Sequence, residues 1–129
     1  KLAFEEEEIP VGAVIVSENR IIARAYNQVE RLGDPTAHAE MLAITSATEF
    51  LGSKYLDGCS LYVTLEPCAM CAGALFWTQI DQLVFASDDP KRGFRQHGAS
   101  LLHPRTKVSH GLMAEESRRL MGLFFERLR

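Results

Sequence analysis

The chain has 129 residues, of which 47% are hydrophobic and 24% are charged, a composition typical of one globular domain. No apolar run reaches the roughly 18 residues of a transmembrane helix, and no signal peptide opens the chain, so we expect a cytoplasmic protein without a membrane partner. Three cysteines are an odd number and cannot all pair, which argues against a secreted disulfide framework. We therefore expect reduced thiols.

The first half of the chain predicts a β-hairpin followed by a helix. Residues 11–16 and 20–26 are β-branched, apolar runs separated by a short polar turn, a pattern typical of a hairpin. Residues 36–51 have apolar side chains at helical spacing, and Gly52 supplies a stop. Residues 1–8 resemble the end of a helix, so we expect a single domain over residues 1–129 whose N-terminal helix is truncated.

The second half alternates strands with helices. We expect a strand over residues 60–65, a helix over 68–79 with Pro67 at its opening, and a strand over 82–86. The remaining chain predicts a long basic loop, a last strand and a last amphipathic helix, at residues 88–106, 107–112 and 114–128. This order predicts an α/β fold with three layers, in which helices cover both faces of a mixed, mostly five-stranded sheet.

The stretch L-E-P-C-A-M-C contains Cys68 and Cys71, whose spacing fits a redox pair, half of a structural zinc site or half of a catalytic metal site. A second pair is impossible because only Cys59 remains, and its position at a strand entrance is typical of a small buried residue. Further metal ligands must therefore come from the four histidines, His38, His97, His103 and His110.

His38 is the strongest candidate, because it lies in D-P-T-A-H-A-E at the start of a predicted helix. Cys68 and Cys71 lie at the start of the next helix, and both helices follow strands, so both N-termini are expected at the same edge of the sheet. Glu40 follows His38 by two residues, and such side chains diverge by about 200° along a helix wall. They converge only on a group at the helix end.

These residues carry a resemblance to a known family. H-A-E followed by P-C-A-M-C is the H-x-E…P-C-x-x-C signature of the zinc-dependent nucleobase deaminases. I-P-V-G-A-V-I-V, Asn27, D-P-T-A-H-A-E and L-Y-V-T-L-E-P-C-A-M-C-A-G-A resemble the bacterial tRNA adenosine deaminases, which convert the wobble adenosine to inosine. The resemblance covers most of residues 8–87, resumes at the C-terminal helix, and implies a cytidine deaminase-like fold.

The resemblance implies one Zn²⁺ per chain, held by His38, Cys68 and Cys71 with water in the fourth position. Two thiolates neutralise the charge of the ion, so the water is acidified less than it would be by neutral ligands, and a base must assist. Glu40 is implied to take a proton from the water and to deliver protons to the adenine ring nitrogen and the departing ammonia.

Several single residues of this chain also match functional positions of the family. Asn27 is implied to hydrogen-bond the extruded base, with a turn-capping role as its alternative, and the main-chain N–H of Ala39 is implied to meet the substrate. Phe124 and Phe125 match an aromatic pair that touches the anticodon loop, so the expected partner is the anticodon stem-loop of tRNA. The family also implies a homodimer, and the apolar stretch at residues 74–77 fits either a core or an interface.

Residues 90–105 match the family poorly. The stretch K-R-G-F-R, residues 91–95, is basic and aromatic, which suits an RNA contact. His97 and His103 lie in this loop and are expected to be exposed or RNA-facing rather than metal-bound. The charge distribution is compatible with an anionic partner, since residues 91–129 are net positive and residues 1–90 net negative, but the charges alone favour a solvated amphipathic helix as the explanation.

Three alternatives stay open at this point. A small-molecule deaminase acting on guanine, cytosine or a nucleotide would share H-A-E and P-C-x-x-C, whereas a riboflavin-pathway deaminase has its cysteines further apart. A non-catalytic, zinc-stabilised binding module would need a fourth protein ligand, such as His97 or His103, and no Glu40. A purely structural domain with buried cysteines would leave the paired motifs at the two helix starts unexplained.

Overall fold

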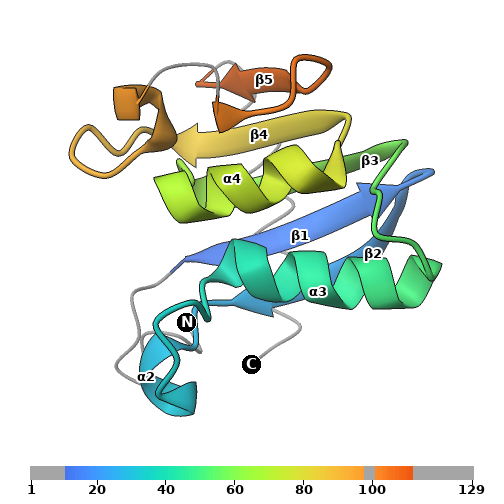
Figure 1. Ribbon diagram of the computed structural model, residues 1–129, viewed down its shortest axis with the longest axis horizontal. Helices are drawn as coiled ribbons and strands as arrows, with labels where there is room; N and C mark the ends of the chain where they lie inside the picture. The colour runs from blue at the N-terminus through green and yellow to red at the C-terminus, as the bar shows by residue number, and fades with distance from the viewer. Residues whose placement is uncertain (1–10, 98–100, 112–129) are drawn as a thin grey trace.

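The computed structural model describes residues 11–97 and 101–111 (Figure 1). Its centre is a five-stranded sheet in the order β2-β1-β3-β4-β5. Strand β1 runs antiparallel to both β2 and β3, whereas β3, β4 and β5 are parallel, so the prediction of a mixed sheet is confirmed. The strands are β1 Gly12–Ser17, β2 Arg20–Tyr26, β3 Cys59–Leu65, β4 Gln82–Ser87 and β5 Lys107–His110.

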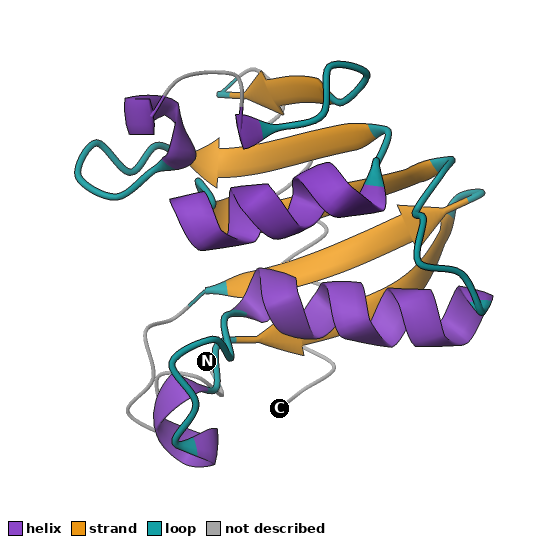
Figure 2. Cartoon of the chain, in the orientation of Figure 1, coloured by secondary structure: helices purple, strands orange, loops and turns teal. Residues whose placement is uncertain are grey.

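Two helices, α3 (Ala39–Leu51) and α4 (Ala69–Thr78), lie side by side on one face of the sheet (Figure 2). Two shorter elements are also present: α2 (Val29–Leu32), in a segment with no predicted element, and the 3₁₀ helix η1 (Phe94–His97), within the predicted loop over residues 88–106. The expected helix over residues 114–128, which would contribute to a further layer, lies outside the described residues, as does the expected helix end at residues 1–8. None of the helices in the described ranges is long and apolar enough to cross a membrane.

Both covering helices begin slightly later than the sequence predicts. Helix α3 begins at Ala39 because the carboxylate of Asp34 accepts hydrogen bonds from the backbone N–H and the hydroxyl of Thr36, which holds the preceding residues in a turn. Pro67 lies before α4 rather than in its first turn, and Cys68 is the N-cap residue. Gly52 ends α3 with a φ of +65°, as predicted.

The core lies between the sheet and these two helices. Central strands β1, β3 and β4 bury aliphatic and aromatic side chains, and α3 and α4 contribute mostly small residues, which lets the helices approach the sheet closely. Each fully buried large side chain contributes roughly 1.5–3 kcal/mol of transfer free energy. The largest fully buried side chains include Phe85, Ile15, Leu56, Leu61 and Leu75.

The topology brings the beginnings of α3 and α4 together. Strands β2 and β3 point the same way because both are antiparallel to β1, which lies between them. Helix α3 follows β2 and α4 follows β3, so both helices begin at the carboxyl ends of these strands, on the left in Figure 1. The predicted meeting of the two helix N-termini at one edge of the sheet is therefore confirmed.

Candidate metal centre and substrate pocket

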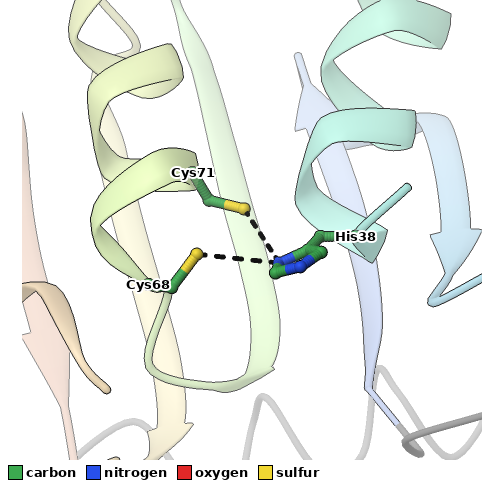
Figure 3. Close-up of side chains that lie close together, drawn as sticks. All are labelled: His38, Cys68 and Cys71. Atoms are coloured by element: carbon green, nitrogen blue, oxygen red, sulfur yellow. Dashed lines mark hydrogen bonds between the residues drawn. The ribbon is translucent and has the colours of Figure 1, made fainter. Parts of the chain in front are cut away.

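Three potential metal ligands meet between the two helix N-termini (Figure 3). His38 is the N-cap residue of α3, Cys68 is the N-cap residue of α4, and Cys71 lies in the first turn of α4. The Nδ1 atom of His38 lies 3.6 Å from the Sγ atom of Cys68 and 3.6 Å from that of Cys71. We call these three residues the donor cluster; within residues 11–97 and 101–111, no other group of three or more His, Cys, Asp and Glu side chains converges in this way.

The spacing of the donor cluster fits a zinc ion. Tetrahedral zinc binds sulfur at about 2.3 Å and nitrogen at about 2.0–2.1 Å, which places a ligand sulfur and a ligand nitrogen about 3.6 Å apart. Both sulfur-to-nitrogen distances in the donor cluster have this value. Two sulfurs and one imidazole are also the donor types that zinc prefers. Three protein ligands leave one tetrahedral position for water or substrate, which is the pattern of a catalytic rather than a structural site.

The two thiols of the donor cluster interact directly. A hydrogen bond from the Cys71 thiol stabilises the thiolate of Cys68 and lowers the pKa of Cys68 to about 5, although partial burial opposes this shift. The pKa of Cys71 is raised, because that hydrogen bond favours its protonated form and because the side chain is buried. One thiolate is thus already present at neutral pH, as a metal ligand requires.

Glu40 lies in the first turn of α3, immediately beside the donor cluster, and only 4% of its surface is exposed. Burial raises the pKa of the Glu40 carboxyl, and the negative charge of Cys68 raises it further, while hydrogen bonding from the α3 backbone opposes the shift. A carboxyl group with a raised pKa exchanges protons more readily near neutral pH than an exposed one. This arrangement suits a general acid and base.

A cavity of about 290 Å³ opens beside the donor cluster. His38, Ala39, Glu40 and Cys68 line it, and the other lining residues come from strand ends, loops and the short helix α2. Its size suits a single nucleobase better than a large ligand. The remaining lining residues are Val11, Asn27, Val29, Glu30, Pro35, Leu65, Glu66, Asp89 and Arg92.

Asn27 and Ala39, both predicted to contact substrate, line this cavity. The side-chain oxygen of Asn27 also accepts a hydrogen bond from the backbone N–H of Val29 at 3.3 Å, so the turn-capping interaction considered from the sequence is present as well. Ala39 is the first residue of α3, where backbone N–H groups have no acceptor within the helix. Phe124 and Phe125, the other two predicted contacts, lie outside the described residues.

The stretch K-R-G-F-R, which suits an RNA contact by its basic and aromatic composition, does not expose its aromatic ring. Phe94 is only 2% exposed, and its ring packs edge-on against the core residue Phe85, with 6.1 Å between the centroids. Arg95 is paired with Glu66 at 3.1 Å and with Asp88 at 2.8 Å. Hydrophobic burial and ion pairing therefore occupy two of the five residues, and the remaining basic ones are Lys91 and Arg92.

Glu66 is a residue that the sequence reasoning missed, although it directly precedes the Pro-Cys pair. Its carboxylate is buried and accepts hydrogen bonds from the backbone N–H of Asp89 at 3.0 Å, the backbone N–H of Arg95 at 3.1 Å and the Arg95 guanidinium at 3.1 Å. Burial alone would raise the pKa of Glu66, but these hydrogen bonds outweigh it and hold the pKa below its usual value. Glu66 thus holds in place the segment from Asp89 to Arg95, which contributes two residues to the cavity lining.

The other histidines and the third cysteine lie apart from the donor cluster. His97 is exposed, and His103 accepts a hydrogen bond from the backbone N–H of Arg105 and lies beside the ring of Phe76. Neither belongs to the donor cluster, so the fourth protein ligand that a non-catalytic zinc module needs is not found among the described residues. Cys59 is fully buried in the core, as predicted, and burial raises the pKa of its thiol.

Comparisons with known proteins agree with this geometry. Residues 1–87 match the family described as the cytidine and deoxycytidylate deaminase zinc-binding region. The tRNA-specific adenosine deaminase of Aquifex aeolicus is 48% identical over 134 residues, which cover 100% of this chain and 88% of that protein. The corresponding Bacillus subtilis protein is 42% identical, with 100% of this chain and 83% of the relative covered.

A solved structure from a study of A-to-I editing by tRNA:A34 deaminases at the wobble position of transfer RNA superposes with a TM-score of 0.80. It is 41% identical, with 92% of this chain and 89% of the other covered. The guanine deaminase of Bacillus subtilis has a TM-score of 0.60 and is 46% identical, but the match covers only 60% of this chain and 50% of that one. The chain is therefore a deaminase of the cytidine and deoxycytidylate deaminase zinc-binding family, and within that family it belongs to the tRNA-specific adenosine deaminases.

Proposed function

We propose that this chain is a single, cytoplasmic, zinc-dependent deaminase domain over residues 1–129 that converts adenosine to inosine at the wobble position of tRNA. The observation that carries the proposal is the convergence of the donor cluster and the buried Glu40 on one nucleobase-sized cavity. The full-length similarity to tRNA-specific adenosine deaminases supports the choice of adenosine in RNA over other nucleobases.

His38, Cys68 and Cys71 would hold one zinc ion per chain, which would supply Lewis-acid chemistry when bound. Glu40 takes a proton from the attacking water and delivers it to the adenine ring nitrogen, which makes C6 more electrophilic. Glu40 then takes the remaining proton of the hydroxyl group added at C6 and transfers it to the amino group, so that the C6–N bond breaks, ammonia leaves and the C6 carbonyl of inosine forms. The balance is one water consumed and one ammonia released for each inosine formed.

Other groups orient the base. The side-chain amide of Asn27 and the backbone N–H of Ala39 hydrogen-bond the purine in the cavity, and both residues line it. The apolar lining residues exclude water from the ring faces. Phe124 and Phe125 stack on bases of the anticodon loop, which extends the recognised substrate to the anticodon stem-loop.

The enzyme acts as a homodimer, with the second subunit completing the substrate groove. Helix α4 supports this proposal, because it contains no charged residue and exposes apolar side chains on the molecular surface. Trp77 is 76% exposed and Met70 is 37% exposed, and they lie seven residues apart on one face of α4. An uncharged helix with an exposed tryptophan is typical of a protein interface.

A guanine-type deaminase is the second candidate, since the guanine deaminase of Bacillus subtilis shares the fold and 46% identity over the matched part. A common zinc site and a common general base would serve either purine, because both reactions replace a ring amino group with oxygen. The two candidates differ in whether the base is taken from RNA or from solution.

The deciding experiment measures ammonia release and inosine formation on an anticodon stem-loop RNA with a wobble adenosine. Free guanine, cytosine, adenosine and cytidine are run in parallel, and the Glu40→Gln variant is the control for contaminating deaminases. We expect inosine in the RNA and no turnover of the free compounds. Turnover of free guanine with an unreacted stem-loop would establish the second candidate and overturn the tRNA proposal.

A further inference from the structure

The cavity lining contains more acidic than basic residues, and this excess affects how the cavity can bind a polyanionic substrate. Its lining contains the carboxylates of Glu30, Glu40, Glu66 and Asp89. Among the described residues that line it, Arg92 is the only arginine or lysine. A cavity that presented carboxylates alone would repel the phosphates on either side of a nucleotide that enters it. Arg92 is therefore the lining residue with the charge needed to offset that repulsion.

Arg92 is held at the cavity by its backbone. Its N–H donates to the carboxylate of Asp89 at 3.0 Å, and the N–H of Gly93 donates to the Asp89 carbonyl at 2.8 Å. The next residue, Phe94, donates its N–H to the carbonyl of Pro67 at 2.8 Å. The segment that carries Arg92 is thus hydrogen-bonded to the β3–α4 connection, which ends at the donor-cluster residue Cys68.

Gly93 makes this attachment possible. A β-carbon at this position would collide with the carboxylate of Glu66, and it would lie 2.6 Å from the carbonyl oxygen of Asp89. The absence of a side chain lets the backbone lie directly on Glu66, whose carboxylate accepts hydrogen bonds on both sides of Arg92, from Asp89 and Arg95. The position of Arg92 relative to the cavity is consequently fixed by buried contacts.

No acidic residue within residues 11–97 and 101–111 forms an ion pair with the guanidinium of Arg92. The neighbouring Arg95 is paired with Glu66 and Asp88, and Arg105 is paired with Asp57 and Asp81. Across the part of the chain that the structure describes, Arg92 makes no ion pair, and the residue is exposed. An exposed arginine that lines a substrate cavity and makes no ion pair can use its guanidinium N–H groups to bind a phosphate.

We propose that Arg92 binds a phosphate of the RNA strand that flanks the target adenosine, and that it thereby favours a polynucleotide over a free base. This inference rests on the proposed function, because it takes an RNA nucleotide to be the group in the cavity. The contact is electrostatic and does not read the base sequence. Arg92 is a substrate-binding residue in this proposal, and the chemistry at C6 does not depend on it.

The test measures how strongly zinc-loaded enzyme binds a fluorescein-labelled anticodon stem-loop with a wobble adenosine, by fluorescence anisotropy at several KCl concentrations. The variants are Arg92→Ala, Arg92→Lys and Arg20→Ala. Arg20 is the matched control because it is an exposed arginine at the opposite end of β2, about 20 Å from Asn27. Zinc content and urea unfolding confirm that each variant is folded.

We expect Arg92→Ala to weaken binding about two- to fivefold at physiological salt, and to reduce the slope of log Kd against log [KCl] by about 0.7–1. Arg92→Lys should keep the wild-type slope, because it keeps the charge, and Arg20→Ala should change neither quantity. In turnover assays, Arg92→Ala should raise KM with kcat unchanged.

Two results would overturn the contact. One is a wild-type slope for Arg92→Ala, and the other is an equal loss of slope for Arg20→Ala, which would show a general charge effect.

Failure of the proposed function would give a different experimental result. A wild-type enzyme that binds the stem-loop but forms no inosine would refute the reaction, while the salt slopes would still decide whether Arg92 contacts a phosphate. Adenosine 5′-monophosphate as competitor separates a free nucleotide from an RNA strand: if it displaced the stem-loop at equimolar concentration, the preference for a polynucleotide would be refuted.

Discussion

Replacing Glu66 with glutamine tests how the cavity wall is held in place. The carboxylate accepts three hydrogen bonds from N–H groups of Asp89 and Arg95, at 3.0–3.1 Å. A glutamine amide has one acceptor oxygen, so its NH₂ group must face at least one of these donors, and one hydrogen bond to a charged group is lost. Such a bond contributes about 1.5–3 kcal/mol. The ion pair with Arg95 adds little, because that side chain is 36% exposed.

We therefore expect Glu66→Gln to lower the free energy of unfolding by about 2–3 kcal/mol at pH 7, measured by urea denaturation. The pH dependence follows from the lowered pKa of Glu66 in the folded protein. The carboxylate contributes its full stabilisation above the unfolded-state pKa of about 4.3, and this contribution is lost as the pH falls through the lower folded-state pKa. The difference between wild type and variant should therefore shrink only below about pH 4.3.

Glu49→Gln is the matched control, because Glu49 is an exposed carboxylate on α3. It should change the free energy of unfolding by less than about 0.5 kcal/mol at any of these pH values. A loss from Glu66→Gln no larger than that of the control would refute the reasoning, and so would a loss that stays constant from pH 7 to pH 3.5. Either result would mean that the three hydrogen bonds do not hold the segment in solution.

Three further predictions concern the reaction, the interface and the packing of the cavity wall. Glu40→Gln should retain one zinc per chain by metal analysis. Its deamination rate should fall by about 10²–10⁴-fold, because the glutamine cannot transfer protons. Full activity would refute the role of Glu40. Trp77→Glu should convert a dimer into a monomer in light scattering, because a buried charge opposes association, and an unchanged mass would refute an α4 interface. Gly93→Ala should lower the free energy of unfolding by about 1–3 kcal/mol, because its β-carbon collides with Glu66. Gly73→Ala, where no atom lies within 4 Å of the added carbon, should not lower it, and equal losses would contradict the packing argument.

Much of the candidate site could be predicted from the sequence, because metal chemistry restricts the residue types and because local spacing restricts their positions. Two cysteines at a helix start and a histidine at another helix start leave few alternatives for completing a ligand set. The alternation of strands and helices predicted a mixed sheet, and the observed helix starts at Ala39 and Ala69 lie within a few residues of the predicted ones. The small error at α3 came from the Asp34 side chain, which competes locally with helix formation.

The basic segment after β4 could not be predicted in the same way. Its basic and aromatic composition suits an RNA contact, but packing against Phe85 places the ring of Phe94 in the core. Whether an aromatic residue in a loop is buried depends on a cavity formed by other elements, and no local pattern records the shape of that cavity. The same holds for Glu66, whose partners are brought to it by the pairing of β3 with β4.

The sequence by itself determined which chemistry this protein can perform, since ligand types, a nearby carboxylate and the helix starts are local properties of the chain. Only the tertiary structure decided which charges are available to a substrate. Arg95 and Arg92 are indistinguishable by composition, yet Arg95 is neutralised by Glu66, a residue 29 positions away, while Arg92 remains unpaired at the cavity among the described residues. Ion pairing is a long-range contact, and it is set by how strands and loops pack rather than by the neighbours of a residue in the chain.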